Sequence, residues 1–183
     1  MTDTTRVAVL VGSLRADSLN RKLAEILRDE APAGVELDLI SGLEQIPFYN
    51  EDLDAGSAPE AAAALRERVA GADRVLAVTP EYNGTMPAVL NNAIDWLSRP
   101  YGAGALVGKP FGVIGATPTP YGGKWAHADT ARSAGIAGAI VVEDVTVSQP
   151  AVEVDPTTDA EVRAKLLDAL TRLAEFAPAT SAA

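Results

Sequence analysis

The chain has 183 residues, of which 48% are hydrophobic, and a formal net charge of −10 from 15 basic and 25 acidic side chains. A chain of this length and composition can bury its own core, so we expect one globular domain over residues 1–183. The acidity argues against nucleic acid and anionic membranes as partners.

The sequence contains no cysteine and a single histidine, His127. Disulfides, thiolate metal sites and cysteine nucleophiles are therefore excluded, and one chain cannot form a multi-histidine metal site, so no metal is predicted. No apolar run is long enough to span a bilayer, and the polar start MTDTTR has no signal-peptide pattern, which predicts a cytoplasmic protein. The ends, Met1–Thr5 and Pro178–Ala183, are expected to be loose.

Apolar patterning predicts strands that alternate with helices. Uninterrupted apolar runs indicate buried strands, and an alternating run indicates a half-exposed edge strand at the second position. The predicted strands are Arg6–Val11, Val35–Ile40, Arg74–Thr79, Lys109–Thr117 and Ala137–Val147. Apolar residues at helical spacing predict helices over 18–30, Ala58–Asp73, Met86–Pro100, Trp125–Gly135 and Thr157–Ala177.

This alternation predicts an α/β fold in three layers, with a five-stranded parallel sheet between two layers of helices. An exposed second strand suits the strand order 2-1-3-4-5. Such sheets bind ligands beyond the carboxyl ends of their strands, at the switch point between the first and third strands. Unusual residues collect in three of the loops at that edge.

The first loop is GSLRADSLN, Gly12–Asn20, which is rich in hydroxyls and opens a helix. A helix N-terminus favours an anion, to which Ser13, Ser18 and Asn20 can donate and Arg15 can add a forked cation. The loop lacks both the Walker A and the G-x-G-x-x-G patterns, so a terminal monophosphate suits it better than a pyrophosphate. The alternative is that Ser18 only caps the helix and Arg15 is solvated.

The second loop, TPEYNG, follows the third strand. Pro80 stiffens its start, and Gly84 permits a left-handed turn. Asn83 and the backbone N–H groups of the turn can face the polar edge of a ring, while Tyr82 supplies an apolar face. Glu81 is either part of the wall or a solvated turn residue.

The third loop, TPTPYGGKWAHAD, begins at Thr117 after the fourth strand. Gly122 and Gly123 can let the backbone approach a ligand closely, although for this loop taken alone an ordinary glycine turn is the better explanation. Together the three loops predict a site with a phosphate at one end and a flat, partly polar ring at the other. FMN in a flavodoxin-like crevice has this shape.

Two of these motifs resemble the NADPH-dependent FMN reductase family, the flavodoxin-like group that includes quinone and chromate reductases. The stretch GSLRADSLNRKLA is similar to the family's G-S-x-R-x-x-S-x-N phosphate loop. The stretch TPEYNGTMPAVLNNAIDWLSRP is similar to its P-E-Y-N-x-x-x-P-x-x-L-K-N-x-x-D-W segment. The matched positions are Gly12, Ser13, Arg15, Ser18, Asn20, Pro80, Glu81, Tyr82, Asn83, Pro87, Leu90, Asn92, Asp95 and Trp96.

The resemblance implies that the first loop holds the FMN phosphate and that Pro80–Asn83 border the isoalloxazine. The expected cofactor-binding residues are Ser13, Arg15, Ser18, Leu19, Asn20, Pro80, Glu81, Tyr82, Asn83, Gly84, Thr117, Gly122 and Gly123. The chain departs from the family at Asn91, where a lysine is usual, and at Trp125, where the third loop commonly has arginine.

The resemblance also implies a ping-pong reaction, in which hydride passes from NADPH or NADH to N5 of FMN and then to a quinone-like or other small electron acceptor. No side chain is expected to be catalytic. A homodimer or homotetramer is expected, with loops near 43–54 and 98–105 flanking the site.

Three other functions compete with this one. A flavodoxin-type electron carrier would share the fold, the acidity and FMN, but its T-x-T-G-x-T phosphate loop is missing here. An FMN-binding regulatory protein with slow turnover is a second alternative. A hydrolase would need a base and a G-x-S-x-G elbow; the elbow is absent, and His127 is expected to be a surface residue of a helix.

Overall fold

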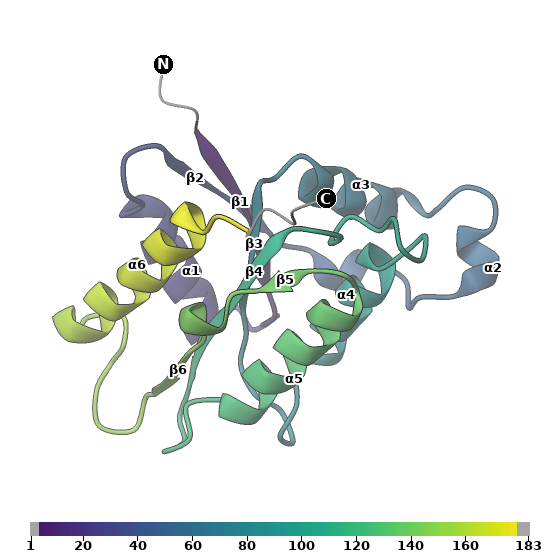
Figure 1. Ribbon diagram of the computed structural model, residues 1–183. Coiled ribbons are helices and arrows are strands. Elements are labelled where there is room, and N and C mark those ends of the chain that lie inside the picture. Colours follow the sequence, from purple (N-terminus) through teal and green to yellow (C-terminus); the bar gives the residue numbers. More distant parts are fainter. Residues whose placement is uncertain (1–3, 179–183) are drawn as a thin grey trace.

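The computed structural model describes residues 4–178 and contains one parallel sheet that runs through the middle of the molecule (Figure 1). Five strands follow one another in the order β2-β1-β3-β4-β5, and a sixth, β6, also pairs with β4. The strands are β1 (Thr5–Val11), β2 (Val35–Ile40), β3 (Arg74–Val78), β4 (Pro110–Thr117), β5 (Ile140–Val141) and β6 (Val147–Pro150). The predicted α/β class and strand order are confirmed.

Helices cover both faces of the sheet (Figure 1). The longer helices are α1 (Leu19–Asp29), α3 (Glu60–Ala70), α4 (Ala88–Leu97), α5 (Lys124–Ile136) and α6 (Ala160–Glu175). Buried side chains of α3, α4 and α5 pack on one face, and those of α1 and α6 pack on the other. None of the helices within residues 4–178 has the length and apolar character needed to cross a bilayer.

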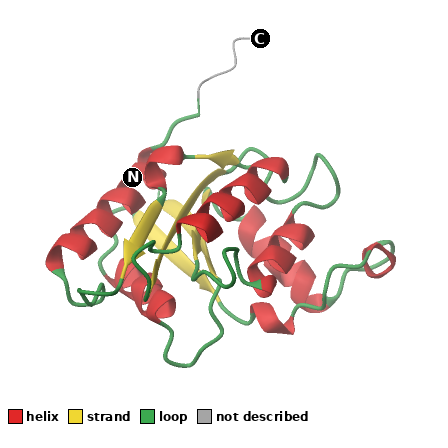
Figure 2. Cartoon of the chain, turned by 90° about the horizontal axis from the view of Figure 1, so that it is seen from below, coloured by secondary structure: helices red, strands yellow, loops and turns green. Residues whose placement is uncertain are grey.

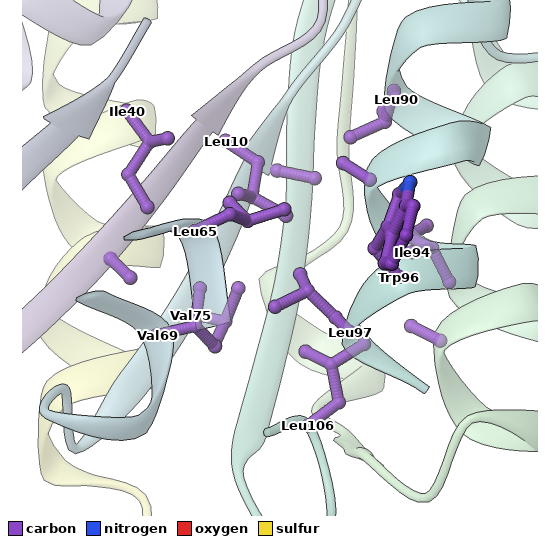
Figure 3. Close-up of a cluster of buried hydrophobic side chains, with 14 of the residues drawn as sticks. Leu10, Ile40, Leu65, Val69, Val75, Leu90, Ile94, Trp96, Leu97 and Leu106 are labelled. Carbon is purple, nitrogen blue, oxygen red and sulfur yellow. The ribbon is translucent and has the colours of Figure 1, made fainter. Parts of the chain in front are cut away.

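The two hydrophobic clusters follow from the alternation of side chains along buried strands. Successive residues of a strand point to opposite faces, so Ala8 and Leu10 of β1 enter one cluster while Val7 and Val9 enter the other. Figure 3 shows the first cluster, in which Leu10 lies among side chains from α3 and α4. Both faces of β1, β3 and β4 are therefore dry, which explains their continuous apolar runs.

The fifth predicted strand, Ala137–Val147, is wrong as a continuous element. The structure divides it into β5 and β6, with a single 3₁₀ turn (Glu143–Val145) between them. Val145 turns inward over Gly112 of β4, where an added Cβ would lie 2.4 Å from Cγ1 of Val145. The chain then pairs again with β4 along Ile114–Thr117, so both pieces lie along the same edge of that strand.

The chain ends differ in part from the expectation of loose tails. Thr5 is the first residue of β1, and its N–H donates to the carbonyl of Gly34 at 2.8 Å, so the expectation is wrong for this residue. Residues 1–3 and 179–183, to which the same expectation applies, lie outside the described residues.

The long connection after β2 contains two short helices that the sequence patterns did not predict. A 3₁₀ turn spans Leu43–Gln45, and α2 spans Glu51–Asp54. Arg66 of α3 holds α2 with a pair of 2.7 Å hydrogen bonds to the carboxylate of Asp54. This bidentate contact gives a helix of one turn the tertiary support that its own length cannot provide.

Asn92 of α4 fixes the middle of this connection. Its side-chain oxygen accepts from the N–H of Tyr49 at 2.8 Å, and its NH₂ group donates to the carbonyls of Ile46 and Pro47 at 3.2 and 3.1 Å. Trp96, one turn further along α4, donates from Nε1 to the same Pro47 carbonyl at 2.8 Å. The family-like residues Asn92 and Trp96 therefore act on the backbone of residues 46–49.

We expect Asn92→Ala to lower the free energy of unfolding by about 2–3 kcal/mol, because it leaves buried backbone groups of residues 46–49 without partners. Urea denaturation measures this loss. Asn91→Ala is the matched control: Asn91 is exposed, and its one side-chain hydrogen bond within residues 4–178 goes to the Asp95 carboxylate, so we expect a change within about 0.5 kcal/mol. Equal losses in the two variants would contradict the assignment.

Candidate functional site

The three loops singled out in the sequence meet at the carboxyl ends of β1, β3 and β4. Figure 2, which is seen from below, looks onto this edge of the sheet, where loops drawn in green connect the strands to the helices. The loops enclose a pocket of about 220 Å³. Its lining residues are Ser13, Arg15, Ser18, Leu19, Asn20, Pro80, Glu81, Tyr82, Ala116, Thr117, Pro118 and Thr119.

Most of the expected cofactor-binding residues are brought together in this pocket. The exceptions are Asn83, Gly84, Gly122 and Gly123, which do not line it. Ala116, Pro118 and Thr119 line it although the sequence did not mark them. Since these three flank the predicted Thr117 at the end of β4, the carboxyl-end rule could have found them.

The first loop has the features of an anion site. Ser18 is the N-cap of α1, and its Oγ accepts from the N–H of Arg21 at 3.1 Å. The N–H groups of Leu19 and Asn20 in the first turn have no partner within the helix. Ser13 is buried at the base of the loop, while Arg15 is exposed and forms no ion pair with any residue in the described range.

The two interpretations of Ser18 are therefore compatible. Its oxygen accepts the capping bond with a lone pair, and its own hydrogen remains available to donate. The residue both caps α1 and lines the pocket. Capping turns the hydroxyl toward the helix end, which is where an anion would lie.

Asn20 has a structural role that the sequence analysis did not predict. Its side chain is buried and lies along β4, donating to the carbonyl of Ala116 at 3.0 Å and accepting from the N–H of Ala116 at 2.9 Å. The amide group thus copies the hydrogen bonds of a neighbouring strand. It ties the start of α1 to the end of β4 and holds two walls of the pocket at a fixed separation.

The second loop is a tight hairpin. Tyr82 and Thr85 exchange two backbone hydrogen bonds, of 3.0 and 3.1 Å, and the two residues between them have positive φ, +52° for Asn83 and +75° for Gly84. This is the geometry of a type I′ turn, for which Asn-Gly is the preferred pair. The turn therefore accounts for Asn83 and Gly84, and the ring contact expected of Asn83 remains a prediction.

Glu81 connects this hairpin to α5. Its Oε2 accepts from the N–H groups of Trp125 and Ala126, each at 3.0 Å, in the first turn of that helix. Thr85 on the other side of the hairpin donates to the carboxylate of Asp129. Glu81 is thus neither a solvated turn residue nor a free carboxylate, because it caps a helix that starts 43 residues later in the chain.

The third loop owes its two glycines to packing. Gly122 and Gly123 have φ of +63° and +90°, which L side chains rarely adopt. An added Cβ on Gly122 would lie 2.6 Å from the backbone of Ser148 in β6, and one on Gly123 would lie 3.1 Å from Nε2 of His127. Neither glycine borders the pocket, and the expected close approach of this backbone to a ligand stays a prediction.

His127 is completely buried, with 0% exposure, so the expectation of a surface residue is wrong. Its Nδ1 lies 2.7 Å from Oγ of Ser148, and its Nε2 lies 3.2 Å from the carbonyl oxygen of Thr79. A carbonyl can only accept, which assigns the hydrogen to Nε2 and makes Nδ1 the acceptor from Ser148. Apolar residues do not gather on one side of α5, so no pattern in the sequence indicated that the side carrying His127 is buried.

Burial lowers the pKa of His127 below its ordinary value, an effect opposed by the Thr79 carbonyl and the Glu81 carboxylate. At acidic pH the unfolded chain therefore binds a proton that the folded chain binds less readily. The stabilising contribution of the neutral ring is complete above the unfolded pKa of about 6.5 and is lost as the pH falls below it.

We accordingly expect the free energy of unfolding to fall more steeply between about pH 7 and pH 5 in the natural chain than in His127→Gln, which has no titrating ring. Urea denaturation at several pH values measures both slopes. His127 is the only histidine, so no other imidazole titrates in this range. The acidic groups are common to both proteins, so their contributions cancel in the difference between the slopes. Identical slopes would contradict the assigned burial of the neutral ring.

Comparison with known proteins agrees with this architecture. Residues 5–153 match the sequence model described as NADPH-dependent FMN reductase. A quinone reductase from Pseudomonas putida is 46% identical over 123 residues, which are 67% of this chain and 66% of that protein. A 2-hydroxy-1,4-benzoquinone reductase from Burkholderia sp is 46% identical over 112 residues, 61% of this chain and 60% of that protein. These alignments span slightly less than two thirds of each relative.

One solved structure is similar over nearly its whole length. It is FerB, a flavoenzyme NAD(P)H:(acceptor) oxidoreductase from Paracoccus denitrificans, with 33% sequence identity and a TM-score of 0.76. The similarity covers 93% of this chain and 97% of FerB. With the family match extending over most of the sequence, the chain belongs to the NADPH-dependent FMN reductase family.

Proposed function

We propose that the protein is an NAD(P)H-dependent oxidoreductase that binds FMN at the carboxyl edge of the sheet and reduces quinone-like or other small electron acceptors. Family membership, the names of the quinone reductase relatives and the similarity to the flavoenzyme FerB support this function. The observation that carries the proposal is the pocket itself, whose lining combines polar and cationic groups of the first loop with apolar surface from Pro80 and Ala116.

The residues present fit the two halves of FMN. Ser13, Ser18 and the first N–H groups of α1 can donate to a phosphate, and Arg15 supplies a positive charge in a chain of net charge −10. Pro80 and Ala116 offer apolar surface for a ring. Tyr82 is 47% exposed at the rim, where the pocket opens to solvent.

When bound, FMN would supply the redox chemistry of hydride transfer, and the nicotinamide and the acceptor would use the pocket in alternating, ping-pong order. The chain binds the cofactor, orients it and leaves one side of the pocket open for the two substrates in turn. No imidazole base serves the reaction, because His127 is buried and bonded to Ser148 and Thr79. The absence of a catalytic side chain is therefore part of the proposal.

A homodimer or homotetramer in the cytoplasm belongs to the same proposal. The two segments expected to flank the site, 43–54 and 98–105, adjoin each other, with the Arg99 guanidinium 5.6 Å from the centre of the Tyr49 ring. Each segment exposes a large apolar side chain: Phe48 is 76% exposed and Tyr101 is 87% exposed. Exposed aromatic residues of this kind favour contact with a second subunit.

The purified protein is expected to show a flavin visible spectrum that bleaches on addition of NADPH. It should also oxidise NADPH in steady state when a simple quinone is the acceptor, with no partner protein present. These measurements separate the proposed enzyme from a flavodoxin-type carrier, which would hold FMN without turnover of its own. Bound FMN with no oxidation of NADPH or NADH would favour the carrier or a regulatory protein.

Arg15→Ala is expected to weaken FMN binding by about 10-fold or more, because it removes a charge-assisted hydrogen bond to the phosphate. Riboflavin, which lacks the phosphate, should bind the variant and the natural protein equally. Titration of flavin fluorescence measures both affinities. Lys165→Ala in α6 makes the same change of net charge at an exposed site and serves as the control. An unchanged FMN affinity in Arg15→Ala would refute this role.

A further inference from the structure

We propose that His127 is a positioning residue for the flavin pocket, which sets the direction of the Pro80–Tyr82 wall through its hydrogen bond to the carbonyl of Thr79. His127 does not line the pocket. The inference rests on the proposed function, since it takes the ligand of this pocket to be FMN. It concerns a buried polar group that the proposed reaction does not otherwise use.

Thr79 directly precedes the Pro80–Tyr82 wall, and each of its polar groups forms a hydrogen bond. Its N–H donates to the carbonyl of Ile114 in β4 at 3.0 Å, and its Oγ1 donates to the carbonyl of Pro80 at 3.0 Å. Its own carbonyl faces Nε2 of His127 at 3.2 Å. The residue is 0% exposed, so no water can replace a lost partner without a rearrangement.

The hydrogen bond to this carbonyl controls Pro80 because a peptide unit is planar. The Thr79 oxygen and the Pro80 nitrogen belong to the same rigid group, so turning the carbonyl also turns the proline ring. Pro80 has no N–H with which to hold itself to a neighbouring strand. His127 therefore supplies the contact that a backbone donor would otherwise give at this position, and Pro80 lines the pocket.

Thr79 packs so closely against Gly12 and Gly115 that neither position has room for a side chain. A Cβ on Gly115 would lie 2.1 Å from the Thr79 oxygen, 2.8 Å from Nε2 of His127 and 3.0 Å from Oδ1 of Asn20. A Cβ on Gly12 would lie 2.7 Å from Oγ1 of Thr79. Thr79 thus contacts the phosphate loop on one side and the His127 ring on the other, with little room to shift.

Ser148 of β6 holds the opposite nitrogen of the ring and fixes its orientation. The charged group that faces the ring from another element is the Glu81 carboxylate, which is itself bonded to the N-terminus of α5. On α5 itself, Asp129 contacts Thr85 and Arg132. The imidazole is therefore oriented by fixed neighbours, and its Nε2–H is aimed at a single acceptor.

Two substitutions at this position separate positioning from packing. In His127→Gln the terminal amide reaches the place of Nε2 and can still donate to the Thr79 carbonyl. In His127→Asn the shorter amide takes the place of Nδ1, where it can still bond to Ser148 but cannot reach Thr79. Both variants remove the ring from a buried site, so both should lose stability, and urea denaturation measures each loss.

The dissociation constant of FMN distinguishes the two variants, because a loss of packing alone would affect it similarly in both. We expect His127→Gln to keep the FMN affinity within about 2-fold and His127→Asn to weaken it by about 5- to 10-fold, the effect of one hydrogen bond. Equal affinities in the two variants, or losses that merely follow their loss of stability, overturn the inference. A natural protein that binds no FMN at all refutes the proposed function, and this inference with it.

A measurement on the natural protein guards against a variant that does not fold. In proton NMR the Nε2–H of His127 should give a separate, slowly exchanging signal, because the ring is buried and bonded at both nitrogens. Saturation with FMN is expected to shift this signal, since the ligand presses on the wall that the Thr79 carbonyl directs. A signal that does not move while FMN binds overturns the inference.

Discussion

The close approach of three strand ends around Thr79 is the constraint on which the site depends. The carboxyl ends of β1, β3 and β4 converge there, and Gly12 and Gly115 are the residues that let the backbones come within contact. Because glycine has no Cβ, the strand ends can approach this closely, and a Cβ at either position would force them apart. The loops that follow then start from nearly one point, which is why they form a single pocket.

Polar side chains replace missing backbone partners at this convergence. Beyond the last ladder bonds, the carbonyl and N–H groups of the strand ends would be buried without partners. Asn20 bonds to both backbone groups of Ala116, and His127 bonds to the carbonyl of Thr79. These buried amide and imidazole groups supply hydrogen bonds to the strand ends at the point where the main-chain ladder stops.

Sequence patterns predicted the architecture well because buried parallel strands and amphipathic helices leave a local signal. The convergence of the three loops also followed, since strand order decides which loops share an edge. The patterns put His127 on the surface and missed the break between β5 and β6. Both features depend on contacts between residues distant in sequence. Val145 turns inward to fill the space above Gly112, and nothing near Val145 in the sequence indicates that space.

The same limit explains the ambiguous residues of the motifs. Ser18 and Arg15 line the same pocket, which their closeness in sequence to the start of α1 made easy to expect. Glu81 could not be assigned, because the N–H groups that it caps belong to Trp125 and Ala126. Asn83 was expected to face a ligand, whereas the positive φ of a type I′ turn is sufficient reason for asparagine there.

Capping by Glu81 also bears on where an anion can bind. The helices α1 and α5 are two of those that begin at this edge of the sheet, and the N-terminus of each would attract a negative charge. At α5 the Glu81 carboxylate already occupies the first N–H groups. At α1 the cap is the neutral Ser18, and Arg15 adds a positive charge without an ion pair among residues 4–178. The Glu81 carboxylate thus neutralises the N-terminus of α5 from within the chain, whereas no carboxylate caps the N-terminus of α1.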